Sequence, residues 1–230
     1  APGSSIISAA RGEGTKGVKM SGTSMAGPHI AGVMALIKQK YMNLPVSDLK
    51  SLLMGHALDI KDENGEPYKL SEQGAGRVQV VPSLTGEVVA SKGAISLGMV
   101  QLETKKVFKQ TLTLKNISAA DKNLSIEFTS KANLSLLNTT SFSLKAGDSK
   151  EVGLKFSLDA TSLKDPMTEV EGMVLVKEGS QLLHRIPVLA VVKKTSAITG
   201  SDLVTHAGGV READGALVEL SLKNDSSFAG

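Results

Sequence analysis

The sequence predicts a first part that contains helices, followed by an all-β part that folds as an antiparallel sandwich. From Ser24 to about Ala57 the apolar residues recur at helical spacing, whereas past about residue 90 they alternate with polar residues. Turn residues separate the alternating segments and no helical pattern lies among them, which argues against a βαβ arrangement there. The chain has 230 residues, of which 41% are hydrophobic and 21% charged, as expected for one large or two modest globular domains.

The helical part contains two predicted helices. The apolar residues of the first form a broad face that is typical of a buried helix: Ile30, Val33, Met34, Leu36 and Ile37. Pro45 interrupts the pattern, Ser47 is a plausible N-cap, and a second, shorter helix runs toward Gly55. Taken alone, these helices would leave apolar side chains uncovered, namely those of Val33, Leu36, Leu52 and Leu53. We therefore expect this part to pack on a missing upstream segment, on the sandwich or on a second copy.

The β part is predicted from alternation over several short segments. These are residues 105–116, 123–130, 141–159, 169–179 and 182–192. Asn116, Gly147-Asp148 and Gly179 supply the turns. One repeat is visible, because "TLTLKNIS" at 111–118 recurs as "ELSLKNDS" at 219–226. We interpret the second copy as the start of another sandwich, cut off by the end of the chain.

Composition excludes several classes of function. The formal net charge is +3 and the lysines are scattered among carboxylates, so a nucleic-acid partner is not expected. Aromatic residues make up 3% and there is no Trp, which argues against base stacking. There is no Cys, so disulfides and thiolate metal sites are excluded. No apolar run is long enough to predict a membrane span.

The stretch "SGTSMAGPHIAG" at 21–32 is the candidate functional motif. Small residues surround Ser24, which would allow a backbone or a substrate to approach it closely. Pro28 fits the first turn of a helix, so Ser24 would stand at a helix N-terminus, where N–H groups favour developing negative charge. The alternative is a Ser or Thr that caps a buried helix, and caps are far commoner than nucleophiles. Spacing alone leaves both interpretations open.

"GTSMAGPH" closely resembles the serine signature of the subtilase family, the subtilisin-like serine peptidases of family S8. Three further stretches resemble segments of that family in the same order: "APGSSIIS" at 1–8, "LKSLLMGHA" at 49–57 and "QGAGRVQV" at 73–80. Two small departures are His56, where Thr is usual, and Gln79, where Asn is common. Residues from about 92 to 196 resemble the fibronectin-III-like sandwich that follows the peptidase domain in cell-envelope subtilases of the lactocepin and C5a-peptidase type.

The resemblance implies a fold class of α/β plus all-β. Residues 1–90 would be the C-terminal portion of a doubly wound α/β peptidase domain, and 91–197 an antiparallel fibronectin-III-like β-sandwich. Residues 198–230 would be a linker and the start of the truncated second sandwich. Because the chain opens on Ala1-Pro2-Gly3 rather than Met, we expect it to be a piece of a longer protein.

The family further implies that Ser24 is the acyl-forming nucleophile of a Ser–His–Asp triad, with its backbone N–H as one oxyanion donor. Subtilases carry the Asp and the His upstream of the Ser. Nothing upstream of Ser24 here matches either context, and the oxyanion Asn is also absent. We therefore expect the parent to be a secreted or cell-envelope bacterial endopeptidase that acts on proteins or peptides, and this fragment alone to be inactive.

The histidines and the glycine-rich stretch have ordinary interpretations. His29 follows Ser24 on the same helix and does not naturally face it, so a buried, hydrogen-bonded structural role is expected. The other histidines show no ligand spacing, and we expect neither a metal site nor a cofactor: His56, His184 and His206. "QGAGR" lacks the phosphate-loop pattern, and the family resemblance implies instead a tight backbone passage that ends the peptidase domain.

Two other hypotheses remain open. The chain could be a non-catalytic binding or adhesion module in which the sandwich acts and the protease remnant is vestigial. It could also derive from a protease that has lost its triad, although the intact signature around Ser24 argues against that. The partners expected under the favoured hypothesis are a peptide substrate and the missing N-terminal part of the peptidase domain. Self-association through exposed apolar surface is expected as well.

Overall fold

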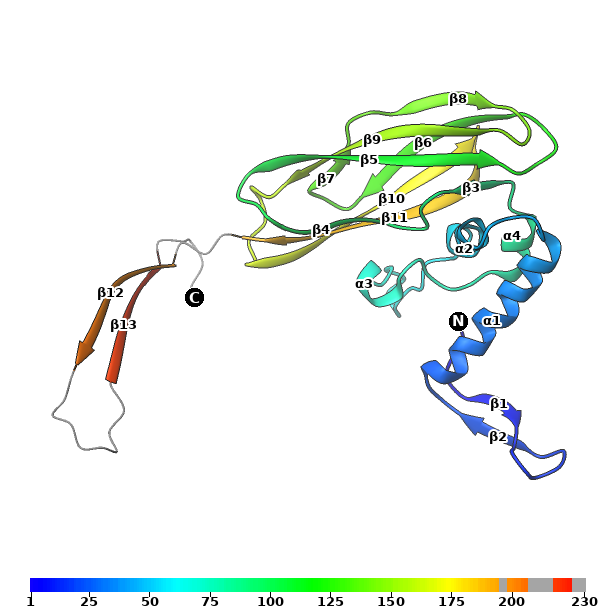
Figure 1. The fold of residues 1–230 in the computed structure, drawn as a ribbon, viewed down its shortest axis with the longest axis horizontal. Helices are drawn as coiled ribbons and strands as arrows, with labels where there is room; N and C mark the ends of the chain where they lie inside the picture. The colour runs from blue at the N-terminus through cyan, green and yellow to red at the C-terminus, as the bar shows by residue number, and fades with distance from the viewer. Residues whose placement is uncertain (195–197, 207–216, 225–230) are drawn as a thin grey trace.

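A computed structural model describes residues 1–194, 198–206 and 217–224, with side chains for the first of these ranges. Figure 1 shows a helical part at the N-terminus, two extended sheets that face each other, and a separate hairpin near the C-terminus. The protein is thus rich in sheet with few helices, as the change of hydrophobic period predicts. Within the described residues, no helix combines the length and hydropathy that crossing a bilayer requires.

The N-terminal part begins with a β-hairpin that the sequence analysis did not predict. Its strands are β1 (Ile6–Ala9) and β2 (Gly17–Met20), and they pair antiparallel. The helices follow: α1 (Thr23–Lys40), α2 (Val46–Gly55), α3 (Leu70–Gln73) and α4 (Val80–Thr85). Pro45, not Ser47, is the N-cap of α2, because its carbonyl accepts the N–H groups of Asp48 and Leu49 at 3.0 and 3.2 Å. Pro thus both ends the preceding segment and starts the next helix.

Two sheets enclose the main core. One has the order β4-β11-β10-β6-β8 and the other the order β3-β5-β9-β7. Their strands are β3 (Val88–Ala90), β4 (Ile95–Gln101), β5 (Lys105–Asn116), β6 (Lys122–Ser130), β7 (Leu134–Leu136), β8 (Thr140–Leu144), β9 (Ser149–Asp159), β10 (Met167–Glu178) and β11 (Gln181–Lys193). The predicted strands are therefore confirmed, and Gly147 and Gly179 adopt positive φ in the turns that join them.

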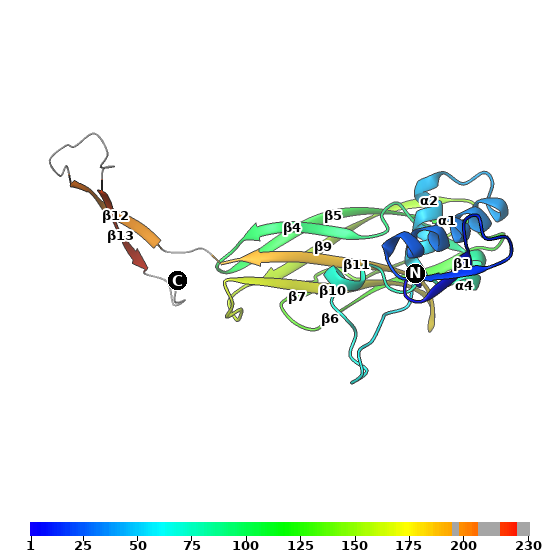
Figure 2. The same ribbon diagram turned by 90° about the horizontal axis from the view of Figure 1, so that it is seen from below.

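The core between the sheets is built from alternate residues of each strand. The inward side chains are fully or almost fully buried, among them Leu112, Leu114, Leu154 and Phe156 of one sheet and Ile126, Val174, Val176 and Ile186 of the other. Figure 2, turned from the first view, shows the long strands running side by side. This period of two is what the alternating segments of the sequence encode.

One strand pair corrects the expectation of a purely antiparallel sandwich. β4 runs parallel to β11, with Val188 opposite Ile95. The two strands are separated by the whole intervening set of strands, so no tight turn dictates an antiparallel pairing. β3 ends at Ala90, the last residue of the predicted peptidase part, and it pairs with β5. The sheets therefore begin before residue 91.

The helical part packs on the sheets through a second, smaller core. It consists of Val33, Ile37, Leu49, Leu52 and Val89, with Val89 supplied by β3. Val33 and Leu52, which the helices alone would leave uncovered, are 8% and 0% exposed here, whereas Leu36 stays 47% exposed. Of the three alternatives that the sequence leaves open for this part, the described residues show packing on the two sheets. We call this contact between α2 and the strands β3 and β11 the seam.

The C-terminal hairpin consists of β12 (Ile198–His206) and β13 (Leu217–Asn224), paired antiparallel. The first six residues of the repeated motif lie on β5 in one copy and on β13 in the other, and both strands end at the corresponding Asn, Asn116 and Asn224. Residues 225 and 226 of the second copy lie outside the described residues. A second sandwich that starts here stays a prediction.

Candidate active site

Ser24 is the second residue of α1, and its side chain is exposed. The N-cap is Gly22, with φ of 153°, a conformation that other residues rarely adopt. No side chain caps this helix. The interpretation of Ser24 as a helix cap is therefore wrong, and its hydroxyl is not occupied by the backbone of its own helix.

The segment that resembles the family's A-P-G stretch lies directly against the serine turn. The N–H of Gly22 donates to the carbonyl of Gly3 at 2.7 Å, and the N–H of Ser5 donates to Ser21 Oγ at 2.9 Å. A Cβ on Gly3 would lie 2.9 Å from the Gly22 carbonyl oxygen, so only Gly allows this approach. Two motifs separated by nearly twenty residues thus form one structural unit around the candidate nucleophile.

The first turn of α1 presents unused N–H groups. Met25 and Ala26 donate to the Gly22 carbonyl at 3.1 and 3.3 Å. Among the described residues, the N–H groups of Thr23 and Ser24 have no acceptor, as expected at a helix start. The positive end of the helix dipole lies at the same place. The turn can therefore stabilise an oxyanion beside the Ser24 hydroxyl.

The sequence predicts that Pro28 lies in the first turn of a helix. In the structure it is the sixth residue of α1 and lies in the second turn. Because Pro has no N–H, the carbonyl of Ser24 loses its donor four residues along the helix. Because Ser24 is exposed at the start of the helix, water can donate to its carbonyl in place of the missing N–H group.

His29 does not serve Ser24 in this structure. Its Nδ1–H donates to the carbonyl of Met25 at 2.8 Å, so the expected hydrogen-bonded role holds, but the side chain is exposed rather than buried. Within residues 1–194, no hydrogen bond joins the Ser24 hydroxyl to a histidine or a carboxylate. Among the described side chains there is thus a candidate nucleophile with oxyanion donors, and no general base hydrogen-bonded to it.

The remaining predicted sites are placed as follows. Gly76 of "QGAGR" has φ of 111°, a Cβ there would overlap the Leu58 carbonyl, and Arg77 and Leu58 exchange backbone hydrogen bonds, as fits a tight passage. His56 and His184 are not isolated in space, because their ring centroids lie 5.7 Å apart. His206 lies on β12, where only the backbone is described. The described residues hold no group of three potential metal ligands.

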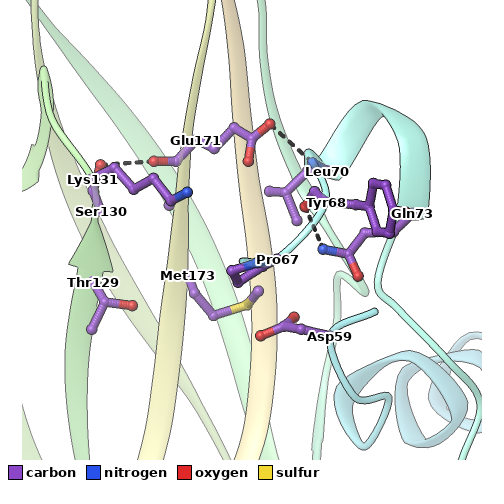
Figure 3. A pocket seen from close by; sticks show the side chains of 11 residues that line it. Asp59, Pro67, Tyr68, Leu70, Gln73, Thr129, Ser130, Lys131, Glu171 and Met173 are labelled. Carbon is purple, nitrogen blue, oxygen red and sulfur yellow. Dashed lines mark hydrogen bonds between the residues drawn. The ribbon is translucent and has the colours of Figure 1, made fainter. Parts of the chain in front are cut away.

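A groove that the sequence analysis missed lies between the segment around α3 and the strands β6 and β10, with a volume of about 290 Å³ (Figure 3). Tyr68 and Leu70 line one side and Met173 the other, and the N–H of Leu70 donates to Glu171 Oε1 at 2.9 Å. Its lining contains no residue before Asp59, so the groove is separate from the Ser24 site. No sequence pattern could have found it, because its walls come from segments about 100 residues apart.

Comparison with known proteins agrees with the sequence resemblance in its coarse form. Residues 1–76 match the model of the subtilase family. The chain is 31% identical over 175 residues to the minor extracellular protease Vpr of Bacillus subtilis, which covers 75% of this chain and 22% of that relative. It is 53% identical over 55 residues to the subtilisin-like protease SBT2.3 of Arabidopsis thaliana, covering 24% of this chain and 6% of the relative. The chain thus spans about a fifth or less of these relatives.

Among solved structures, a crystal structure of tripeptidyl peptidase 2 aligns with a TM-score of 0.47 and 15% sequence identity. The alignment covers 82% of this chain and 17% of the tripeptidyl peptidase 2 chain. Relatives also occur in fungi, such as a subtilisin-like protease of Coccidioides posadasii, 39% identical over 80 residues, 34% of this chain and 20% of the relative. Bacterial, plant and fungal relatives together do not support the expected bacterial origin. The matches also do not establish a fibronectin-III-like or lactocepin-type identity for the two sheets, which stays a prediction.

Proposed function

We propose that this chain is the C-terminal part of the catalytic region of a secreted subtilisin-like serine endopeptidase, with Ser24 as the nucleophile. The observation that supports this most directly is the joint occurrence of the family match over residues 1–76 and an exposed Ser24 at the start of α1. The hydroxyl has no partner in its helix, and the neighbouring N–H groups have no acceptor among the described residues.

The chemistry follows from this geometry. Ser24 Oγ attacks the carbonyl carbon of the scissile peptide bond while a base takes its proton, and the carbonyl oxygen becomes an oxyanion. The N–H of Ser24 donates to that oxyanion at the positive end of α1. Collapse of the tetrahedral intermediate expels the amine, which receives the proton, and leaves an acyl-enzyme that water hydrolyses. The His, the Asp and the oxyanion Asn would come from sequence upstream of residue 1, so we expect this chain alone to be inactive.

The sandwich has a supporting role in this proposal. The seam buries Leu52 and Val89 completely or nearly so, which joins the helix that follows the nucleophile helix to the two sheets. We propose that it is a fibronectin-III-like module that stabilises the catalytic region, with peptides as substrates. The apolar side chains that stay exposed on the hairpin and α1, such as Ile7 and Leu36, are where the upstream chain or a second copy would pack.

A fluorophosphonate probe tests the nucleophile directly. It should label Ser24, with loss of fluoride, only in a longer chain that includes the upstream Asp and His, and not in this chain. Ser24→Ala should abolish labelling, while Ser47→Ala, a change of another exposed helix-start serine, should leave it intact. If the longer wild-type chain stays unlabelled, the proposed nucleophile is wrong and the role of the sandwich as a non-catalytic binding module becomes the better hypothesis.

A further inference from the structure

The seam contains a histidine with no solvent exposure. His184 lies on β11 and is 0% exposed, facing α2. Its Nε2 lies 3.1 Å from Ser51 Oγ, and that same oxygen accepts the N–H of Ala90 on β3 at 2.8 Å. Ser51 is itself 1% exposed. One buried hydroxyl therefore connects α2, β3 and β11, and the imidazole is part of that connection.

The space around the ring is closed. A Cβ on Gly55 would overlap the His184 imidazole, so the last turn of α2 lies directly on it. The ring of His56 meets it edge-on at 85°, and a Cβ on Gly86 would lie 2.5 Å from His56 Cε1. The Nδ1 atom of His184 is buried without a hydrogen-bond partner of good geometry. The ring is thus shut off from water, and of the groups around it the backbone of Val88 favours a second proton.

Within residues 1–194, no carboxylate is paired with the His184 ring. At the end of α2 the titratable neighbour is the C-cap residue His56, and Asp48 in the first turn of α2 lies 3.9 Å from the Lys115 ammonium. β3 presents apolar residues, and the partner on β10 is Val176. The flanking Arg185 is held by the Ala57 carbonyl at 2.9 Å and by Asp59. In the segment before β3, Glu87 is paired with Lys122 at 2.8 Å. The charged groups near the seam are therefore already paired with one another, away from the His184 ring.

Burial, together with the nearby His56, lowers the pKa of His184 to about 3. The backbone of Val88 acts in the opposite direction but does not offset the burial. Burial also lowers the pKa of His56, against the effect of its Nδ1–H bond to the Leu52 carbonyl at 2.9 Å. Both histidines are thus neutral in the closed seam and gain protons more readily once it opens.

We propose that the seam is an acid-opened latch, in which protonation of His184 and His56 separates α2 from β3 and β11 while the two sheets stay paired. The sheets are held by long ladders around the main core, whereas the seam is held by a small core and one buried polar cluster. The seam is therefore the first place to open. The inference does not depend on the assignment of Ser24 as a nucleophile.

The direction of the pH effect follows from linkage. The closed seam binds the His184 proton only near pH 3, and the open seam binds it near the ordinary value of about 6.5. The stability of the seam is therefore fully present above about pH 6.5 and declines as the pH falls. Well below that value, uptake of one proton on opening raises the opening equilibrium about tenfold per pH unit, and His56 adds to this.

Hydrogen exchange of the 230-residue chain between about pH 7 and 4, corrected for intrinsic exchange, tests the latch. Protection of the α2 amides and of the Ala90 N–H should fall by roughly tenfold per pH unit below pH 6, while amides of β5 and β9 stay protected. His184→Gln keeps a group that can hydrogen-bond Ser51 but cannot titrate, so its seam protection should lose most of this dependence. His29→Gln, which removes an exposed histidine outside the seam, should retain it.

An unchanged pH dependence in His184→Gln overturns the latch. If that variant does not fold, the imidazole C–H resonances of the wild-type chain decide the matter. The proposal is supported if the His184 resonance of the closed form does not titrate near pH 6.5 while the exchange protection of the α2 amides falls. A His184 signal that titrates near pH 6.5 with α2 protection unchanged overturns it.

Discussion

Replacement of Leu52 by Ala should destabilise the attachment of the helices to the sheets more than any exposed change on the same helices. Leu52 is 0% exposed and lies in the small core with Leu49 and Val89. A Cβ on Gly86 would lie 2.5 Å from Leu52 Cδ2, so the side chain packs directly against this backbone. The perturbation therefore removes buried carbon atoms and leaves a cavity.

The magnitude can be worked from these facts. The three carbon atoms lost correspond to about 2.4 kcal/mol at roughly 0.8 kcal/mol each. The unrelaxed cavity adds to this, within a range of about 2–5 kcal/mol for buried Leu→Ala changes, so we expect about 3–4 kcal/mol. Leu36→Ala is the matched control on α1, because Leu36 is 47% exposed and its removal should cost less than about 1 kcal/mol.

The assay is urea unfolding followed by helix circular dichroism, with segment-resolved hydrogen exchange to show where protection is lost. Leu52→Ala should reduce protection of α2 and leave the sheet amides of β5 and β9 largely protected. Equal costs for Leu52→Ala and Leu36→Ala would refute the reasoning, because the two sites would then be equally buried in solution and the described seam would not exist.

Two further outcomes follow from packing and charge. Gly55→Ala places a methyl group against the His184 ring. The variant should unfold with a free energy about 1–3 kcal/mol lower in urea, although Ala has the better helix propensity. A neutral or stabilising effect would contradict this contact. The hydrogen bond from the Asn123 N–H holds the pKa of Glu178 below its ordinary value, and the Lys122 ammonium lowers it further. Lys122→Met should therefore raise the Glu178 pKa, measured in a carboxyl ¹³C titration. An unchanged Glu178 pKa would show that the ion pair, 3.0 Å long in the structure, does not persist in solution.

The secondary structure was largely predictable because burial in this protein follows simple periods. Alternate residues of β5 and β10 are buried, and the sequence shows the same alternation of apolar and polar residues. The hairpin of β1 and β2 was missed, because its strands are short and three of four residues in the first, and all in the second, are exposed. The parallel pairing of β4 with β11 was missed because no local pattern specifies a neighbour so distant in sequence.

The candidate active site was predictable in identity but not in environment. The residues around Ser24 form a contiguous motif, so a single stretch of sequence reveals it. The packing of Gly3 on Gly22, and the place of Pro28 in the second turn, follow from backbone positions that the motif does not state. His29 resembles a buried structural residue in sequence, but its side chain is exposed in the structure.

The sequence by itself determined the division into helical and alternating parts, the nucleophile candidate and the class of chemistry, because each depends on residues adjacent or periodic along the chain. Only the tertiary structure decided that Leu52 is covered, that β4 runs parallel to β11, and that His184 is enclosed by Ser51 and Gly55. These features join residues about 40 to more than 130 positions apart. Burial and proton affinity depend on which surfaces meet, and that is settled only when the helices close against the sheets.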